Sequence, residues 1–398
     1  MTADDFPTST DVLVVGAGPT GLALATSLRQ LGADVTLIDL GTEIRTDSRA
    51  AGVQPRTLQD LDRIGAAGPL IANGLEGTGF RVTNKDGVLL DLPYGDLDTP
   101  YPFLLLVPQS ETEQVLRDAL TRTDGQVWSG YRLLELRPEF DAVATLVADD
   151  AGLVHSVRAR YVVGCDGLHS GVRDQAGIAF EGRRRPQEYT LADVRMTEPT
   201  GTPRVTFTFS PDGMLLRSSL PGNIIRVVAS VRAGPGALDK AGVQDLIDRR
   251  CGPAERATVA EIVRSTPYQV TSRLAAAFGQ GRVFLAGDAA HVHSPAGGQG
   301  MNTGIQDAVH LAGLLAAVLR GADPGVLDRY DAERRPNAAA LLTFTGQLTS
   351  VAELSDPTEM KLRDEVLARI RDLPDLAPFL ARRLAQLDVP PADWPERN

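Results

Sequence analysis

Three segments far apart in the chain each place glycine and an acidic residue directly after an apolar run. The first reads Asp11-Val-Leu-Val-Val-Gly-Ala-Gly-Pro-Thr-Gly, and the apolar run that follows it ends at Asp39. The second is Tyr-Val-Val-Gly-Cys-Asp166-Gly, and the third is Arg-Val-Phe-Leu-Ala-Gly-Asp288. Continuous apolar runs of this length are typical of strands buried on both faces. The segments therefore predict three strands of an α/β fold, each ending in a turn suited to binding a ligand.

The first segment has the spacing of a dinucleotide-binding turn. Gly16 permits a tight turn, Gly18 lets the backbone approach a pyrophosphate, and Gly21 allows the helix to pack closely on the strands. A helix that begins near Pro19 directs unpaired N–H groups and the positive end of its dipole at the phosphates. Asp39 is placed to accept hydrogen bonds from ribose hydroxyls, which favours FAD or NAD over NADP as the ligand at this position.

The third segment favours FAD over NAD. Beyond Asp288 the chain passes His291, Pro295 and a glycine-rich run that ends in Gly300-Met301-Asn302, where a helix is expected to begin. Backbone N–H groups at that helix start suit a polar heteroaromatic edge, and a carboxylate before it suits a polyol. A second half-pocket so far along the chain fits a long cofactor that lies across the domain. A plain NAD dehydrogenase does not need such a second half-pocket.

The hydrophobic periodicity along the chain predicts a discontinuous nucleotide domain with an inserted sheet. Residues 76–107 and 181–275 show period-two alternation punctuated by proline and glycine, which indicates an antiparallel substrate-binding sheet. Residues 1–75, 108–180 and 276–340 form the predicted Rossmann-like FAD-binding domain. Helical spacing of leucine and alanine at 305–319, 338–348 and 361–387 predicts C-terminal helices, with 341–398 as a separate helical region.

Composition restricts the partners. The net charge of -11 argues against a non-specific grip on nucleic acid or on an anionic membrane. No apolar run is long enough to cross a bilayer, and residues 1–10 lack the pattern of a signal peptide, so we expect a cytoplasmic protein. His291 and His293 have no third ligand nearby, and two cysteines make no cluster, so no metal site is expected. A monomer and a homodimer both remain open.

Further segments resemble the group A flavoprotein monooxygenases, the family of para-hydroxybenzoate hydroxylase and the aromatic polyketide hydroxylases. They are Arg49-Ala-Ala-Gly-Val-Gln-Pro-Arg-Thr-Leu, Pro-Gln109-Ser-Glu-Thr-Glu-Gln-Val-Leu and Tyr330-Asp-Ala-Glu-Arg-Arg-Pro. With the three glycine motifs, the resemblance covers roughly residues 10–180 and 270–340. It implies the Rossmann-like fold of para-hydroxybenzoate hydroxylase, with the inserted sheet that the alternation also predicts.

The resemblance assigns roles by position. Gly16, Gly18, Gly21 and Asp39 would bind the ADP half of FAD, and Arg49 would face the pyrophosphate. Gln109 and Asp288 would lie at the ribityl chain, and Asp166 would link the flavin and nicotinamide sites. The residues expected to border the isoalloxazine ring are Pro295 and Gly298, as the catalytic pair, with Gly300 and Met301. Substrate-lining residues are expected among Phe207, Phe209, Met214 and Arg217, although alternating aromatics on a strand also suit an ordinary core.

The resemblance implies a monooxygenase with non-covalent FAD. Hydride from NADH or NADPH would reduce FAD, oxygen would add at the flavin C4a, and the hydroperoxide would hydroxylate a small aromatic or polyketide-like polycyclic substrate, as in antibiotic biosynthesis. Baeyer–Villiger insertion or epoxidation would use the same cofactor site. A reductase or oxidase without oxygen insertion, and a nucleotide-binding protein without redox chemistry, are the other classes.

Two features depart from the family pattern. We expect no thioredoxin-like domain after the helical region, and a tryptophan that the family often has near Gly313 is absent. The substrate, the position of hydroxylation, a catalytic base and the choice between NADH and NADPH are not readable from the sequence.

Overall fold

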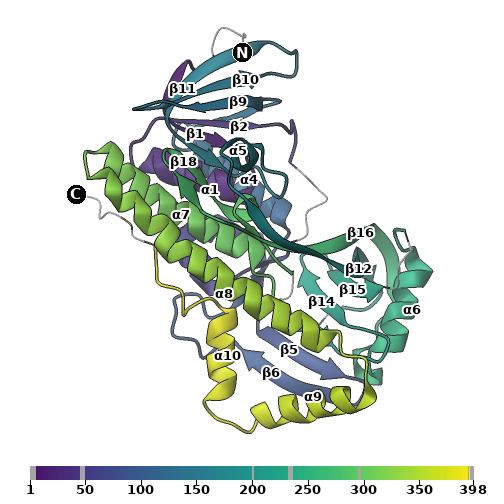
Figure 1. Cartoon of the computed structure of the whole chain (residues 1–398). Helices are drawn as coiled ribbons and strands as arrows, with labels where there is room; N and C mark the ends of the chain where they lie inside the picture. Colours follow the sequence, from purple (N-terminus) through teal and green to yellow (C-terminus); the bar gives the residue numbers. More distant parts are fainter. Residues whose placement is uncertain are drawn as a thin grey trace.

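The computed structural model describes residues 6–44, 50–199, 201–231, 236–294, 297–392 and 394, with only the backbone described at 185 and 186. One sheet has the strand order β17-β18-β11-β1-β2-β8, and its four central strands and β8 are parallel (Figure 1). The strands β9 and β10 extend it by antiparallel pairing onto the first half of β11. Its strands are β1 (Ser9–Val15), β2 (Val35–Asp39), β8 (Val127–Ser129), β9 (Arg132–Pro138), β10 (Val143–Ala148), β11 (Val154–Gly164), β17 (Gly279–Gln280) and β18 (Val283–Leu285).

The parallel strands are apolar because helices cover them. Residues 12–15 of β1 are 0 to 7% exposed, which is the burial that the continuous apolar run predicts. The helix α1 contacts both α4 and α7, and α7 also contacts α2 and α8. These helices are α1 (Pro19–Gln30), α2 (Pro55–Arg63), α3 (Ala67–Ala72), α4 (Gln109–Thr121), α5 (Gly171–Gln175) and α7 (Gly300–Leu319), with the short helices η3 (Gly287–Ala289) and η4 (Pro324–Leu327).

The second sheet has the order β19-β16-β12-β15-β14-β13-β5-β6 and is antiparallel except where β13 pairs with β5. The helix α6 (Lys240–Arg250) packs on one face of this sheet (Figure 1), and the short helix η2 (Pro253–Glu255) follows it. Its strands are β5 (Gly79–Asn84), β6 (Gly87–Pro93), β12 (Phe180–Met196), β13 (Val205–Thr208), β14 (Leu215–Leu220), β15 (Ile224–Val231), β16 (Val259–Ala275) and β19 (His291–Val292). A small third sheet joins β3 (Gly52–Val53), β7 (Leu104–Leu106) and β4 (Leu75–Gly77).

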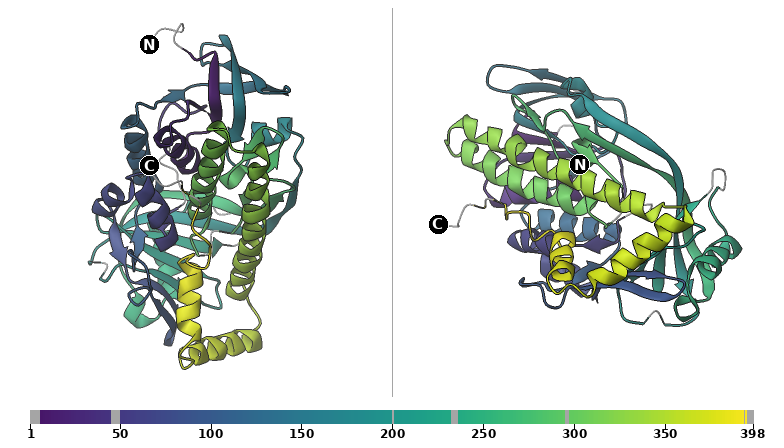
Figure 2. Two further views of the ribbon diagram at one scale, coloured as in Figure 1. Left: turned by 90° about the vertical axis from the view of Figure 1, so that its left-hand side faces the viewer. Right: turned by 60° about the horizontal axis from the view of Figure 1, so that its bottom comes forward.

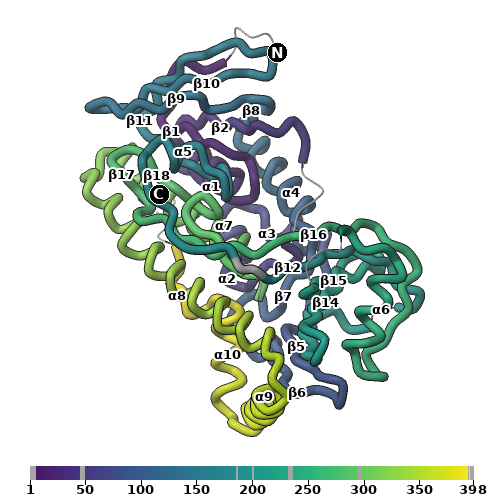
Figure 3. Tube along the Cα trace, turned by 45° about the vertical axis from the view of Figure 1, so that its right-hand side comes forward, coloured from purple at the N-terminus to yellow at the C-terminus, as the bar shows by residue number. Residues whose placement is uncertain are grey.

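One long helix connects the two sheets, and two shorter helices follow it. The long helix α8 (Asp328–Ala352) runs beside α7 from the parallel sheet toward β16 of the second sheet (Figure 2). The chain then turns into α9 (Pro357–Ile370) and α10 (Leu376–Leu384), which both lie against β6 (Figure 3). The residues after α10 return to the helices of the first sheet, where Arg63 of α2 donates to the backbone oxygen of Ala392 at 3.0 Å. None of the described helices combines the length and apolarity needed to cross a membrane.

The fold class predicted from the sequence is confirmed, with three local corrections. The inserted sheet is not wholly antiparallel, and the segment expected to form only strands also contains α6, whose apolar residues are too few and too mixed with charge for a clear helical pattern. The single helical stretch expected over 361–387 is two helices, because a turn containing Pro374 separates them. The domain boundaries stay a prediction. One strand from the segment assigned to the FAD-binding domain, β19 within 276–340, pairs with β16 at the edge of the second sheet.

A buried carboxylate on α2 predicts an unusual dependence of stability on pH. Asp60 is 1% exposed, and burial raises its pKa to about 6 even though Arg63, Arg334 and Arg56 oppose the shift. Because the folded-state pKa is raised, ionisation of Asp60 costs stability above pH 6, and this cost disappears as the pH falls toward the unfolded-state value. We expect Asp60→Asn to raise the free energy of unfolding by about 1–3 kcal/mol at pH 7.5 and much less at pH 4.5.

Urea unfolding of the wild type and of Asp60→Asn at both pH values measures this difference. Asp62→Asn, an exposed change on the same helix, is the control. An equal effect of Asp60→Asn at the two pH values would contradict the prediction.

Candidate functional site

The acidic residues of the three motifs meet at one edge of the parallel sheet. Because β18, β11, β1 and β2 are neighbouring parallel strands, their carboxyl ends point the same way. Asp288, Asp166, Gly16 and Asp39 follow these strands in that spatial order. Ligands of open α/β sheets bind outside the carboxyl ends of the strands, so the topology brings the sequence-predicted residues to the edge where a cofactor is expected.

The glycines of the first motif have different surroundings: two are required by close packing, and one borders open space. Gly16 has a φ of +104°, and a Cβ there would lie 2.4 Å from the carbonyl oxygen of Cys165. A Cβ at Gly21 would lie 1.9 Å from the carbonyl oxygen of Gly16. A Cβ at Gly18, in contrast, would meet no described atom within 4 Å. Gly16 and Gly21 therefore serve the turn and the packing of the helix, whereas Gly18 leaves room beside the helix start for a ligand.

Two helix N-termini lie side by side at this edge. Among the described residues, no side chain caps the N-terminus of α1 or of α7, and neither first turn contains an acidic residue. Thr20, in the first turn of α1, packs directly on Gly287 and on Gly304 of α7, where a Cβ would lie 2.6 and 2.5 Å from its hydroxyl oxygen. Uncapped N–H groups and two positive dipole ends suit an anionic pyrophosphate and a polar ring edge, so the arrangement fits FAD.

Asp39 and Asp166 are both held by backbone N–H groups. The two carboxylate oxygens of Asp39 accept hydrogen bonds from the N–H groups of Ala17, at 2.5 Å, and Gly41, at 2.6 Å. Each oxygen retains a second lone pair for a ribose hydroxyl. Asp166 accepts from the N–H of Val172 at 3.1 Å. Burial raises the pKa of Asp166, although hydrogen bonds from Ser170 and from backbone N–H groups act in the opposite direction.

The remaining cofactor residues predicted from the sequence take varied positions. Gln109 is the first residue of α4 and donates to the carboxylate of Glu113 at 2.8 Å. Asp288 is exposed within η3. Gly298 is exposed with a φ of +63°, Gly300 begins α7, and Met301 packs partly on the main core. Arg49 and Pro295 lie outside the described residues, so their predicted roles remain predictions.

Three of the four predicted substrate residues belong to one apolar cluster, and the fourth, Arg217, has ionic and polar partners. Phe209 and Met214 are buried in one apolar cluster, and Phe207 packs against it from β13. Arg217 instead donates to the backbone oxygen of Glu255 at 2.7 Å and pairs with its carboxylate, in the short helix that follows α6. The structure thus associates the three apolar residues with one another and places Arg217 in an ion pair beside α6.

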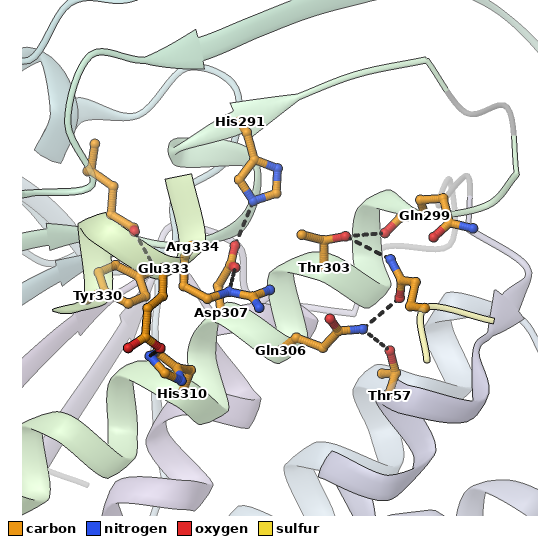
Figure 4. Close-up of polar contacts among 12 residues, drawn as sticks. Thr57, His291, Gln299, Thr303, Gln306, Asp307, His310, Tyr330, Glu333 and Arg334 are labelled. Carbon is orange, nitrogen blue, oxygen red and sulfur yellow. Dashed lines mark hydrogen bonds and ion pairs between the residues drawn. The ribbon is translucent and has the colours of Figure 1, made fainter. Parts of the chain in front are cut away.

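A buried ion-pair cluster on α7 was not predicted from the sequence. The Nε2 atom of His291 lies 2.6 Å from one carboxylate oxygen of Asp307, and Nε of Arg334 donates to the other at 2.7 Å (Figure 4). His291 is 1% exposed and Asp307 is 0% exposed. Burial alone would raise the pKa of Asp307, but Arg334 and His291 together lower it. The cluster ties the start of the glycine-rich segment to α7 and α8.

His293 is a second histidine of this segment, and its pKa is shifted. Burial, with His291 nearby, lowers the pKa of His293 to about 4, so its ring is neutral at neutral pH. Its Nδ1 lies 2.8 Å from the backbone oxygen of Ser294. Across the described residues, no group of three histidine, cysteine or acidic side chains is placed to hold a metal ion.

A second buried cluster joins the inserted sheet to the cofactor domain. Asp193 on β12 binds Arg226 on β15 through both carboxylate oxygens, at 2.7 and 2.8 Å, and also Arg264 on β16 at 2.9 Å. Arg226 donates in addition to the backbone oxygen of Ala50 at 2.7 Å. Asp193, Arg226 and Arg264 gave no sequence signal, because their separation along the chain hides that they are neighbours on adjacent strands of the sheet.

Asp307 offers a direct test of the cluster on α7. Asp307→Asn leaves Arg334 buried without its counter-charge, and we expect the free energy of unfolding at pH 7.5 to fall by about 3–5 kcal/mol. Chemical denaturation measures the change, with the exposed Asp328→Asn as the control. A fall as small as that of the control would show that the buried charges are not coupled.

Known proteins match this chain over most of its length. Residues 9–345 match the family described as FAD binding domain. A flavin-dependent monooxygenase of Mycobacteroides abscessus is 35% identical over 85% of this chain and 74% of its own length. The 6-methylpretetramide 4-monooxygenase of Streptomyces rimosus is 36% identical over 91% of this chain and 66% of its own length, so the chain spans slightly less than two thirds of that relative.

A solved structure shares the architecture from end to end. The crystal structure of p-nitrophenol 4-monooxygenase from Pseudomonas putida DLL-E4 has a TM-score of 0.86 and 26% identity, and the match covers 96% of this chain and 99% of that one. On these grounds the chain belongs to the FAD-binding family of flavin-dependent monooxygenases.

Proposed function

We propose that this protein uses FAD, a reduced nicotinamide and O2 to hydroxylate a small aromatic or polycyclic aromatic compound. The strongest support is the pair of uncapped helix N-termini at the carboxyl edge of the parallel sheet, with Asp39 on the neighbouring strand. When bound, FAD would supply the redox chemistry, accepting hydride from the nicotinamide and activating oxygen.

The protein's own groups would bind and orient the cofactor. Under this proposal the backbone beside Gly18 and the N–H groups of α1 hold the pyrophosphate, with Arg49 facing it, and Asp39 accepts hydrogen bonds from the ribose. The N–H groups of Gly300 and Met301 meet the polar edge of the flavin. Gln109 and Asp288 take the ribityl chain, and Asp166 connects the flavin with the nicotinamide site. Pro295 and Gly298 border the reacting ring.

The substrate class is proposed from the relatives. Their names include 6-methylpretetramide and p-nitrophenol, and the second is a phenol. The apolar cluster of Phe207, Phe209 and Met214 lies in the sheet that would cover the ring of the flavin, and it favours an aromatic over a strongly ionic substrate.

Gly18 provides the first test, because the space beside it is open in the protein. Gly18→Ala adds a Cβ that meets no described atom, so the fold should be unaffected, yet this Cβ would crowd the pyrophosphate. We expect the Kd for FAD to rise at least ~10-fold, which is about 1.4 kcal/mol, with no change in melting temperature of the apoprotein. Fluorescence quenching of FAD measures the Kd, with Gly68→Ala, another open position, as the control. Unchanged affinity would place the pyrophosphate elsewhere.

Labelled oxygen tests the reaction. The protein loaded with FAD is reduced anaerobically with NADH or NADPH and then mixed with 18O2 and either p-nitrophenol or a polycyclic phenol. We expect flavin bleaching, recovery on oxygen addition, and one 18O atom in a new ring hydroxyl. Label in an ester or an epoxide would support Baeyer–Villiger insertion or epoxidation, whereas turnover without label would support a reductase or an oxidase. A protein that binds no FAD would overturn the proposal.

A further inference from the structure

The turn that follows α10 has an unusual residue at its most restricted position. Gln386 has a φ of +59°. The N–H of Leu387 donates to the oxygen of Arg382, and the N–H of Gln386 donates to the oxygen of Arg383. These two bonds define a Schellman motif, in which the left-handed position is usually glycine because a side chain there is strained. The backbone alone therefore favours glycine where this chain has glutamine.

The side chain of Gln386 is buried, and both of its polar atoms are hydrogen-bonded. It is 4% exposed, its Oε1 accepts from Nε2 of Gln306 at 2.6 Å, and its Nε2 donates to Oγ1 of Thr303 at 3.0 Å. Both partners lie on α7, and Gln306 also donates to Thr57 of α2 at 3.0 Å (Figure 4). The strained residue thus joins the C-terminal turn to α7 and, through Gln306, to α2.

A chain of hydrogen bonds runs from Gln386 to the glycine-rich segment. Thr303 accepts from Gln386 and donates its hydroxyl proton to the backbone oxygen of Gln299 at 3.0 Å (Figure 4). Nε2 of Gln299 in turn donates to the backbone oxygens of Gly297, at 2.9 Å, and Leu384, at 3.0 Å. The network therefore closes on itself, because it leaves the turn at Gln386 and returns to it at Leu384.

The turn also contacts the glycine-rich segment directly. A Cβ at Gly297 would lie 3.4 Å from Cδ2 of Leu384. Gly297 and Gly298 both have positive φ, at +84° and +63°, so this backbone depends on neighbouring groups to fix its conformation. The C-terminal turn supplies such groups, because Leu384 lies against Gly297 and accepts a hydrogen bond from Gln299.

We infer that Gln386 is a positioning residue for the cofactor site: through Thr303 and Gln299 it fixes the backbone of Gly297–Gly300 against α7. The consequence for FAD rests on the proposed function, but the effect on the segment itself does not. If Gln386 served only to end α10, glycine would suit the position better. The buried contacts of its amide therefore distinguish a positioning role from a helix-ending role.

Gln386→Gly separates the two roles. The change removes both side-chain hydrogen bonds and relieves the strained φ, so α10 still ends in its motif. Asp124→Gly is the matched control, because Asp124 has a φ of +55° and occupies the same position of a Schellman motif after α4 with an exposed side chain. A second pair, Thr303→Val and Thr303→Ser, removes or retains the hydroxyl that relays the network.

Hydrogen exchange in the apoprotein is the first measurement. We expect Gln386→Gly and Thr303→Val to speed exchange in peptides spanning 297–303 by at least ~10-fold, with wild-type rates for Asp124→Gly and Thr303→Ser. Melting temperatures identify any variant that is destabilised as a whole. Equal exchange in Gln386→Gly and Asp124→Gly would overturn the inference, and so would faster exchange spread evenly over the whole chain.

FAD binding and oxygen use are the second measurement. Gln386→Gly should weaken FAD about tenfold and raise the yield of H2O2 per NAD(P)H consumed, while Thr303→Ser keeps wild-type values. If the wild type binds no FAD, the proposed function fails, yet the exchange result still decides the positioning role. If the wild type binds FAD and Gln386→Gly matches it in affinity and in H2O2 yield, the positioning role toward the cofactor is overturned.

Discussion

The close approach of α1 to α7 is the constraint on which the candidate site depends. Thr20 fits against Gly287 and Gly304 at distances that exclude any Cβ at those two positions. This contact sets two helix N-termini side by side at the carboxyl edge of the parallel sheet, although the helices begin some 280 residues apart in the chain. Larger residues at either glycine would separate the helices and with them the two sets of N–H groups.

Buried polar groups then fix α7 in place. Asp307 binds His291 and Arg334 in the middle of the helix, while Thr303 and Gln306 bind the C-terminal turn nearer its start. Such groups are costly to bury unless each finds a partner, so together they select one position of the helix. His291, before the glycine-rich segment, and Gln299, within it, both bind this same helix.

Sequence patterns predicted much of this arrangement because the relevant signals are local. The glycine spacing around Gly16 reports a turn, and the apolar runs before Asp39, Asp166 and Asp288 report buried parallel strands. The fold class and the family follow from those signals. In contrast, α6 was missed because it is short and charged, and the break between α9 and α10 was missed because helical spacing persists across it.

What the sequence determined by itself is the glycine turn, the buried strands and the acidic residues at their ends, since each is encoded within a few neighbouring residues. Only the tertiary structure decided that Asp193, Arg226 and Arg264 form one buried cluster, and that Gln386 reaches α7. These contacts join residues from different elements, and their chemistry depends on burial and distance, which no local pattern reports. Likewise, only the fold shows that Arg217, on the strand paired with that of Phe207, directs its side chain to Glu255.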